Sequence, residues 1–353
     1  MNDRELIYDW VRLFATLFVV IGHSEYLSIT TTYGGVSYAL PTQISDSFYS
    51  MAFFIQRLLK SWVYGFHMPL FFMLSGAVFA LKPLKSFECF LESKVKRLLV
   101  PYYVYGLIFM LPIKYVGHFY NEEAIGKAYK GFLIGIESGH LWFFLSLFWS
   151  MLIFYIIVKF LQKFKLDKLY LILFLSLFVS FASHYILFDF GEIKKGLYYI
   201  LYFAIGYCFE KKRKKIDWKL NYIFFVFLLL LGLEILNIKY HLLQWHVAVF
   251  MGCAFTFAMA YLCDKMFKNV SNSKIWDLVT RNLFYVYIFH DPLEYLVLRI
   301  FFSSDYLNYG GGCIMYLLSR TLFVIIISIM LGECVRLMKN KFVKKKMVTA
   351  NGK

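Results

Sequence analysis

Long apolar runs separated by short charged segments occur along the whole chain, and this pattern constrains the fold more than any other feature. An α-helix needs about 20 residues to cross the hydrocarbon core of a bilayer. Apolar residues make up 60% of the chain, against about 45–50% in soluble domains. Ten runs reach or approach a spanning length: 6–26, 62–81, 98–117, 142–161, 169–188, 197–209, 220–236, 245–263, 283–301 and 314–334. The sequence therefore predicts an all-α fold, a polytopic membrane bundle of about ten transmembrane helices.

Lysine and arginine are distributed unevenly between the two sides of this predicted bundle. With a cytoplasmic N-terminus, the inner segments hold 27 of the 38 Lys and Arg residues and the outer segments hold 8. Because cytoplasmic segments carry the excess of basic residues, both termini are predicted to be cytoplasmic. We predict one transmembrane domain over 1–340 and a basic cytoplasmic tail over 341–353. The basic runs 210–215 and 344–346 are interpreted as topology anchors, so we expect no nucleic-acid partner despite the net charge of +16.

The cysteines and histidines show no metal-binding pattern. The six Cys residues form no CxxC pair, and the eight His residues are scattered along the chain. We therefore expect no metal ion in this protein. Charged residues precede the first apolar run and no small-residue cleavage site follows it, so no removable signal peptide is expected.

The first apolar run contains Arg12 and His23, which a lipid environment disfavours. A cation at mid-bilayer costs about 3 kcal/mol on insertion scales, so such residues are functional candidates. Eleven residues make about three helical turns, which places both side chains on one face, about 16 Å apart along the axis. An imidazole is well suited to act as a general base near neutral pH. Asp9 lies one turn before Arg12 and either forms a structural ion pair with it or leaves the guanidinium to bind a phosphate or carbonyl group.

Two further histidines are predicted at the outer ends of their helices, at a depth similar to that of His23. His67 lies near the start of the second run, and His140 directly precedes the fourth. Each is either an interfacial histidine bonded to a neighbour or part of an outer site. Trp142 is either a member of the interfacial aromatic belt or a platform for stacking a sugar. The outer segment 27–61 is rich in Ser, Thr, Tyr and Gly, and we expect it to fold over an outer cavity.

The second run and the basic segment after it each allow two interpretations. Pro69 and Gly76 predict a kinked, tightly packed helix, which simple transmembrane packing would also explain. Lys94, Lys96 and Arg97 precede the third run. They are either charge anchors or a receptor for a polyphosphate such as the nucleotide end of coenzyme A.

The ninth run contains polar residues in an otherwise apolar stretch. His290 and Asp291 are followed by Pro292, which also fits a simple helix break. Asp291 either orients a base or pairs with one of two in-span arginines, Arg299 and Arg320.

Together these residues resemble the acyltransferase-3 family of integral membrane acyltransferases. The resemblance covers nearly the whole chain, in order. Its segments are Arg12-x10-His23, Pro69–Gly76 with Ser75, Lys94-x-x-Arg97 with the following Pro-Tyr, His140-Leu-Trp-Phe, and Ile288–Pro292.

The resemblance implies a cytoplasmic acyl-CoA donor, usually acetyl-CoA, and an acceptor hydroxyl on a cell-surface or exported glycan or a lipid-linked sugar. It also implies a multi-pass protein of the bacterial cytoplasmic membrane. Carried over by position, the catalytic residues are His23 and Arg12. The residues expected to bind the phosphates of coenzyme A are Lys94, Lys96 and Arg97. The acceptor-binding candidates are His67, His140 and Trp142, supported by Asp9, Ser75, His290 and Asp291.

The chain departs from the family pattern in three places. Lys94 stands where many members have Arg, which removes a bidentate phosphate contact. The segment after Trp142 lacks the Glu-Glu-Gln of many members and resembles a sugar O-acetylase-like branch. We also expect no appended hydrolase-like domain.

A transporter or flippase of a glycan or lipid-linked sugar is the main alternative to an O-acyltransferase. A scaffold protein of a polysaccharide-export complex is a third. A transporter needs binding groups but no base aligned with a basic coenzyme site, so Arg12 and His23 favour the enzyme. We expect the pantetheine arm to reach along the 16 Å between them, and His23 to deprotonate the sugar hydroxyl for direct attack on the thioester. An acyl-histidine intermediate is the less favoured route.

Overall fold

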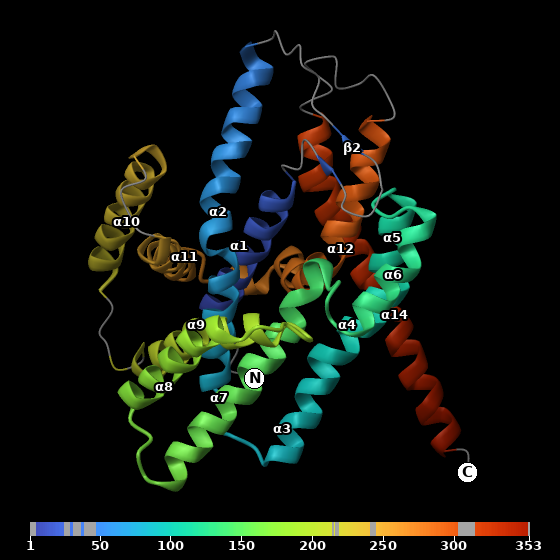
Figure 1. Ribbon diagram of the computed structural model, residues 1–353. Helices are drawn as coiled ribbons and strands as arrows, with labels where there is room; N and C mark the ends of the chain where they lie inside the picture. The colour runs from blue at the N-terminus through green and yellow to red at the C-terminus, as the bar shows by residue number, and fades with distance from the viewer. Residues whose placement is uncertain are drawn as a thin grey trace.

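The computed structural model describes the chain except at 1–4, 25–28, 31–36, 39–46, 214, 216–218, 241–244, 303–314 and 352–353. Helices dominate the described residues, which confirms the all-α class (Figure 1). The helices are α1 (Leu6–His23), α2 (Ser47–Ala80), α3 (Phe87–Lys94), α4 (Val100–Tyr105), α5 (Leu111–Val116), α6 (Glu122–Leu133), α7 (Trp142–Lys163), α8 (Leu169–Ala182), α9 (Ile193–Arg213), α10 (Leu220–Tyr240), α11 (Trp245–Met266), α12 (Lys274–Phe302) and α14 (Val324–Asn351). The strands are β1 (Ile29–Thr30) and β2 (Ser37–Tyr38), which pair antiparallel.

The polytopic membrane character predicted from the sequence is confirmed. Within the described residues, seven helical segments are long and apolar enough to cross a membrane: Leu6–His23, Phe54–Ala80, Phe87–Val116, Gly139–Lys163, Leu220–Asn237, Val247–Met266 and Met315–Lys341. A shorter apolar segment runs over Leu169–Tyr185. The helices α9 and α12 have 21 and 29 residues but fall outside this set. The count of ten spans therefore stays a prediction.

The packing of α2 against α9 forms the centre of the bundle. A Cβ atom on Gly76 would lie 1.9 Å from the carbonyl oxygen of Phe203. A Cβ atom on Gly206 would lie 1.8 Å from the carbonyl oxygen of Met73. Since both contacts are far below any van der Waals distance, only glycine allows the two backbones to approach this closely. The tight packing predicted at Gly76 is confirmed, and α2 continues as a helix across Pro69.

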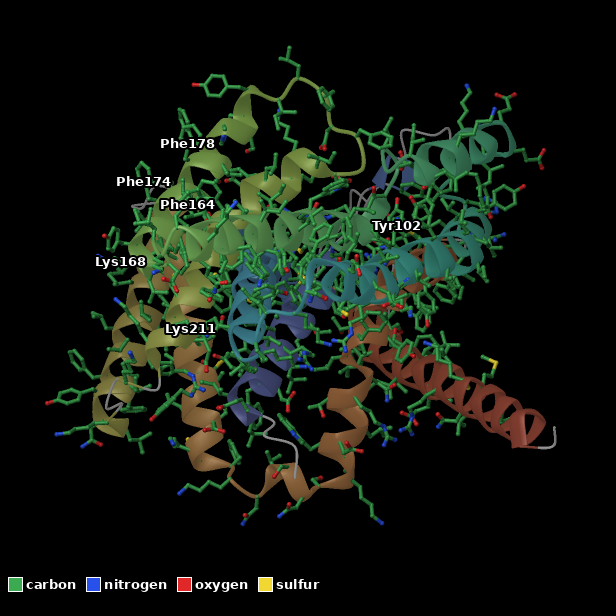
Figure 2. All side chains as sticks on the ribbon, turned by 90° about the horizontal axis from the view of Figure 1, so that it is seen from below. Tyr102, Phe164, Lys168, Phe174, Phe178 and Lys211 are labelled. Atoms are coloured by element: carbon green, nitrogen blue, oxygen red, sulfur yellow. The ribbon has the colours of Figure 1, made fainter. Side chains whose placement is uncertain are left out.

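The third predicted span is one long helical stretch interrupted by two π-helical segments. The segment η1 (Val95–Leu99) separates α3 from α4, and η2 (Gly106–Met110) separates α4 from α5. Tyr102 of α4 stacks on Phe132 of α6 with ring centroids 4.3 Å apart, and Figure 2 shows it inside the fold. Single π-helical turns occur frequently at functional sites. This stretch carries a basic cluster (Lys94, Lys96 and Arg97) at one end and Lys114 at the other.

Apolar side chains cover the outside of the bundle. Phe174 and Phe178 of α8 are 63% and 62% exposed, and Figure 2 shows them at the edge of the molecule, pointing away from the other helices. The helix α10 stands at the margin beside α11, and α14 extends away from the bundle towards the C-terminus (Figure 1). Such exposed apolar faces are typical of contact with lipid.

Two predicted segment boundaries differ from the helix boundaries in the structure. The helix α2 begins at Ser47, well before the predicted start of the second span at 62. Most of the remaining outer segment, with its expected fold over the cavity, lies outside the described residues. The helix α14 continues to Asn351 across the predicted boundary at 340, and the tail over 341–353 stays a prediction.

Candidate active site

A cavity of about 440 Å³ lies between α1, α2, α5, α7, α9 and α12. Its polar lining combines four imidazoles, one ammonium group and one carboxylate. These groups belong to His23, His67, Lys114, His140, His290 and Asp291. A site of this composition in a membrane bundle is costly to bury, and such sites mark function by default.

Asp291 of α12 is the electrostatic centre of the cavity. Its Oδ2 atom lies 2.7 Å from Nζ of Lys114 and 3.0 Å from Nδ1 of His140. Its Oδ1 atom lies 3.3 Å from Nδ1 of His23. The side chains of Asp291 and Lys114 are only 5% and 4% exposed. Because a buried charge must be compensated, the carboxylate and the surrounding cationic groups stabilise one another.

His23 has the arrangement of an oriented general base. Its Nδ1 atom faces Asp291, the arrangement in which a carboxylate orients a histidine base through one ring nitrogen. The side chain is 16% exposed, so it is reachable from the cavity. Of the two interpretations of Asp291, orientation of a base matches the geometry. The alternative pairing with Arg299 or Arg320 is wrong, because Asp291 forms its ion pairs elsewhere.

His140 lies in the 3₁₀ turn Gly139–Leu141, directly before α7, and joins this turn to α12. Its Nε2 atom lies 2.8 Å from the carbonyl oxygen of Ile288, and its own carbonyl oxygen accepts a hydrogen bond of 2.7 Å from the hydroxyl of Tyr287. With Nδ1 against Asp291, both ring nitrogens face acceptors of the protein. His140 therefore fixes the cavity wall in addition to lining it.

His67 and His290 each present one ring nitrogen to their own helix. The Nδ1 atom of His67 lies 2.9 Å from the carbonyl oxygen of Val63, and that of His290 lies 2.7 Å from the carbonyl oxygen of Tyr287. A nitrogen that donates to a carbonyl must carry hydrogen, so the lone pair of the neutral ring is on Nε2. The ring centroids of His23 and His290 are 5.1 Å apart and nearly perpendicular.

A second buried ion pair lies behind the cavity. Arg320, in the π-helical segment η7 (Ser319–Phe323), donates to Oε2 of Glu294 at 3.0 Å. The same guanidinium donates to the carbonyl oxygen of His23 at 3.1 Å and to the hydroxyl of Tyr316 at 2.8 Å. Arg320 thus ties the end of α1 to α12. Arg299, by contrast, donates to the carbonyl oxygen of Val116.

Arg12 does not share the cavity with His23. It lies 3.6 Å from Asp9, its side chain is 39% exposed, and it is not among the cavity-lining residues. The helical rise separates it from His23 by about 16 Å, as the spacing predicts. Ser75 of α2 is half-buried and also lies outside the cavity lining.

The predicted coenzyme-binding residues lie in the same helical stretch as Lys114, but towards its other end. Lys94 places Nζ over the rings of Phe79 and Phe90, at 5.7 and 5.4 Å. Lys96 pairs with Glu92, and Arg97 is exposed. The seventeen residues from Arg97 to Lys114 correspond to about 26 Å of helix, so the basic cluster and the cavity are separate sites.

Trp142 lines the cavity, and its role as a platform for stacking a sugar stays a prediction. Its ring lies 5.7 Å from that of Tyr199, and Nζ of Lys195 lies 5.1 Å from its centroid. In the described part of the chain, no group of three His, Cys, Asp or Glu residues is arranged to hold a metal ion. The expected absence of a metal stays a prediction.

Sequence reasoning missed the roles of Lys114, Glu294 and Arg320. Lys114 lies within the third predicted span but was counted with the outer charges. The argument applied to Arg12, that a cation within a span is costly and functional, would have found it. Glu294 lies one turn after Asp291 on the same helix, and an acidic residue within a predicted span is costly for the same reason.

The structure is that of a polytopic membrane protein with a buried cavity lined by histidines and ion pairs. The sequence pattern of an acyltransferase domain matches residues 6–335. The chain belongs to the acyltransferase-3 family, which confirms the resemblance and makes the protein a membrane acyltransferase. Neither a curated relative nor a solved structure matches the chain.

Proposed function

We propose that this membrane acyltransferase transfers an acyl group, acetyl in the first instance, from cytoplasmic acyl-CoA to a sugar hydroxyl. The acceptor is a cell-surface or exported glycan or its lipid-linked precursor, and the protein resides in the bacterial cytoplasmic membrane with both termini inside. The observation that carries the proposal is the 3.3 Å approach of His23 Nδ1 to the buried carboxylate of Asp291. Membership of an acyltransferase family favours this function over transport of the same glycan.

The proposed reaction begins with proton transfer to His23. Nε2 accepts the proton of the sugar hydroxyl as the oxygen attacks the thioester carbonyl carbon, and Asp291 stabilises the resulting imidazolium. The tetrahedral intermediate then collapses, the C–S bond breaks, and the imidazolium returns the proton to the departing thiolate. The products are the acylated sugar and free coenzyme A, and His23 is neutral again.

The donor is proposed to bind from the other end of the bundle. The basic cluster of Lys94, Lys96 and Arg97 suits the phosphates of coenzyme A, since phosphate oxygens form charge-assisted hydrogen bonds with such cations. The pantetheine arm would run from this cluster past Arg12 and deliver the thioester to His23. The charged nucleotide would then never need to cross the bilayer.

The proposal is tested with detergent-purified protein, radiolabelled acetyl-CoA and cis-cyclohexane-1,2-diol as a simple acceptor, by following the release of free coenzyme A. We expect His23→Ala to lower the rate about 10²- to 10⁴-fold, the usual contribution of a positioned base. The matched control is His184→Ala, because His184 is exposed and lies outside the cavity lining. Equal activity of the two variants, or no thioester cleavage by the native protein, would refute the proposal.

Rapid quenching distinguishes direct attack from an acyl-enzyme. With acetyl-CoA present and no acceptor, direct attack predicts no label bound to protein. Label on His23, located by peptide mass analysis, would instead establish an acyl-histidine intermediate.

A further inference from the structure

His290 is a cavity residue that the proposed reaction does not use. It is fully buried on α12 and lines the cavity next to Asp291. Its Nδ1 atom is held by its own helix, at 2.7 Å from the carbonyl oxygen of Tyr287 and 3.2 Å from that of Val286. The ring is therefore fixed in one tautomer, with the lone pair of neutral His290 on Nε2.

The Nε2 atom of His290 has no hydrogen-bond partner among the described residues. Because Nδ1 faces the helix backbone, Nε2 points away from that backbone, and the atom is itself buried in a residue that lines the cavity. Buried polar atoms in native proteins are almost always satisfied, so such an atom in a cavity wall indicates a ligand group that completes it. A lone pair requires a donor, and a hydroxyl is the donor that a sugar offers.

The position of His290 relative to His23 limits which hydroxyl this can be. The two rings are 5.1 Å apart and nearly perpendicular, so one small ligand can contact both. Neighbouring hydroxyls of a sugar ring are the closest pair that an acceptor presents. Trp142 and Tyr199, whose rings are 5.7 Å apart, line the same cavity and give it aromatic walls.

We propose that His290 determines acceptor specificity: its Nε2 atom accepts a hydrogen bond from the hydroxyl adjacent to the one that His23 deprotonates. The acceptor is then a vicinal diol, and an isolated hydroxyl is a poor substrate. This inference rests on the proposed function and deepens it by naming the chemical feature that the acceptor must carry.

Two substitutions separate this role from a structural one. His290→Gln keeps a polar atom near the position of Nε2, whereas His290→Asn keeps a donor near Nδ1 and removes the polar atom at the position of Nε2. The proposal predicts that His290→Gln retains more transfer activity than His290→Asn. If His290 only anchors the helix through Nδ1, the order is reversed, and that result overturns the proposal.

Simple diols measure the specificity directly. The probes are cis-cyclohexane-1,2-diol and cis-cyclohexane-1,4-diol, which have the same number of hydroxyls but differ in their adjacency. We expect the native protein to show a kcat/KM about 3- to 10-fold higher for the 1,2-diol, the value of one hydrogen bond. His290→Asn should abolish this preference without changing the KM for acetyl-CoA.

The outcomes distinguish this inference from the proposed function. If the native protein cleaves acetyl-CoA but does not prefer the 1,2-diol, the role of His290 is refuted and the proposed function stands. If it does not cleave acetyl-CoA, the proposed function itself has failed. A preference that persists in His290→Asn also refutes the role of His290.

Discussion

The two ends of the helical stretch 87–116 use the same residue type in opposite ways. Lys114 is buried at the cavity and pairs with Asp291 at 2.7 Å. Lys96, near the other end, is 69% exposed and pairs with a carboxylate that is 64% exposed. Exposed pairs contribute little and are screened by salt, whereas buried pairs are strong and screened much less. The cavity thus has a fixed electrostatic field suited to chemistry, and the basic end has adaptable cations suited to binding an anion.

We expect the largest effect on activity from Asp291→Asn, which removes the carboxylate at the buried end of the comparison. The amide cannot stabilise the His23 imidazolium, so kcat should fall about 10²- to 10⁴-fold, as for loss of the base itself. The measurement is steady-state release of coenzyme A. Since the change also leaves Lys114 buried without its partner, Asp291→Asn/Lys114→Met serves as the control. Recovery of activity in the double variant would mean that Asp291 only neutralises Lys114.

The second effect concerns the stability of the cavity. Arg320→Met leaves Glu294 buried without its cation, which should cost about 3–5 kcal/mol in the free energy of unfolding. Thermal unfolding in detergent checks this, with Arg320→Met/Glu294→Met as the control. We expect the double variant to recover most of the lost stability. A single variant as stable as the native protein would contradict the buried pairing.

The third effect tests the basic end. Arg97→Ala should raise the KM for acetyl-CoA about 10-fold or more and leave kcat unchanged, because a charge-assisted bond to phosphate contributes about 1.5–3 kcal/mol. The effect should shrink as salt is added, since Arg97 is exposed. Initial rates at varied acetyl-CoA and salt measure both quantities. A fall in kcat with unchanged KM would place Arg97 with the chemistry and break the division between the two ends.

The smallest effect is expected from Glu92→Gln. This change removes only the exposed pairing with Lys96, so the free energy of unfolding should change by about 0–1 kcal/mol. Chemical unfolding in detergent at low and high salt provides the measurement. A loss as large as that expected for Arg320→Met would show that the basic end is as tightly organised as the cavity.

The helical class and the family could be predicted from the sequence, and His23 could be named as a candidate base. Each depends on local information: the length of apolar runs, the spacing of Arg12 and His23 along one helix, and short motifs in order. The close packing at Gly76 was equally readable, because a small residue in a span favours close helix contact. Lys114 was missed only because its charge was assigned to a loop.

The pairing of His23 with Asp291 was decided by the tertiary structure alone. The two residues belong to α1 and α12, and periodicity within either helix says nothing about how the helices face each other. Their relative rotation depends on contacts such as the bond from Arg320 to the carbonyl oxygen of His23, which joins residues distant in the sequence. The sequence by itself determined which residues are costly in a membrane. Helix packing decided which of them compensate one another, because electrostatic pairing acts over a few ångströms of space and is blind to distance along the chain.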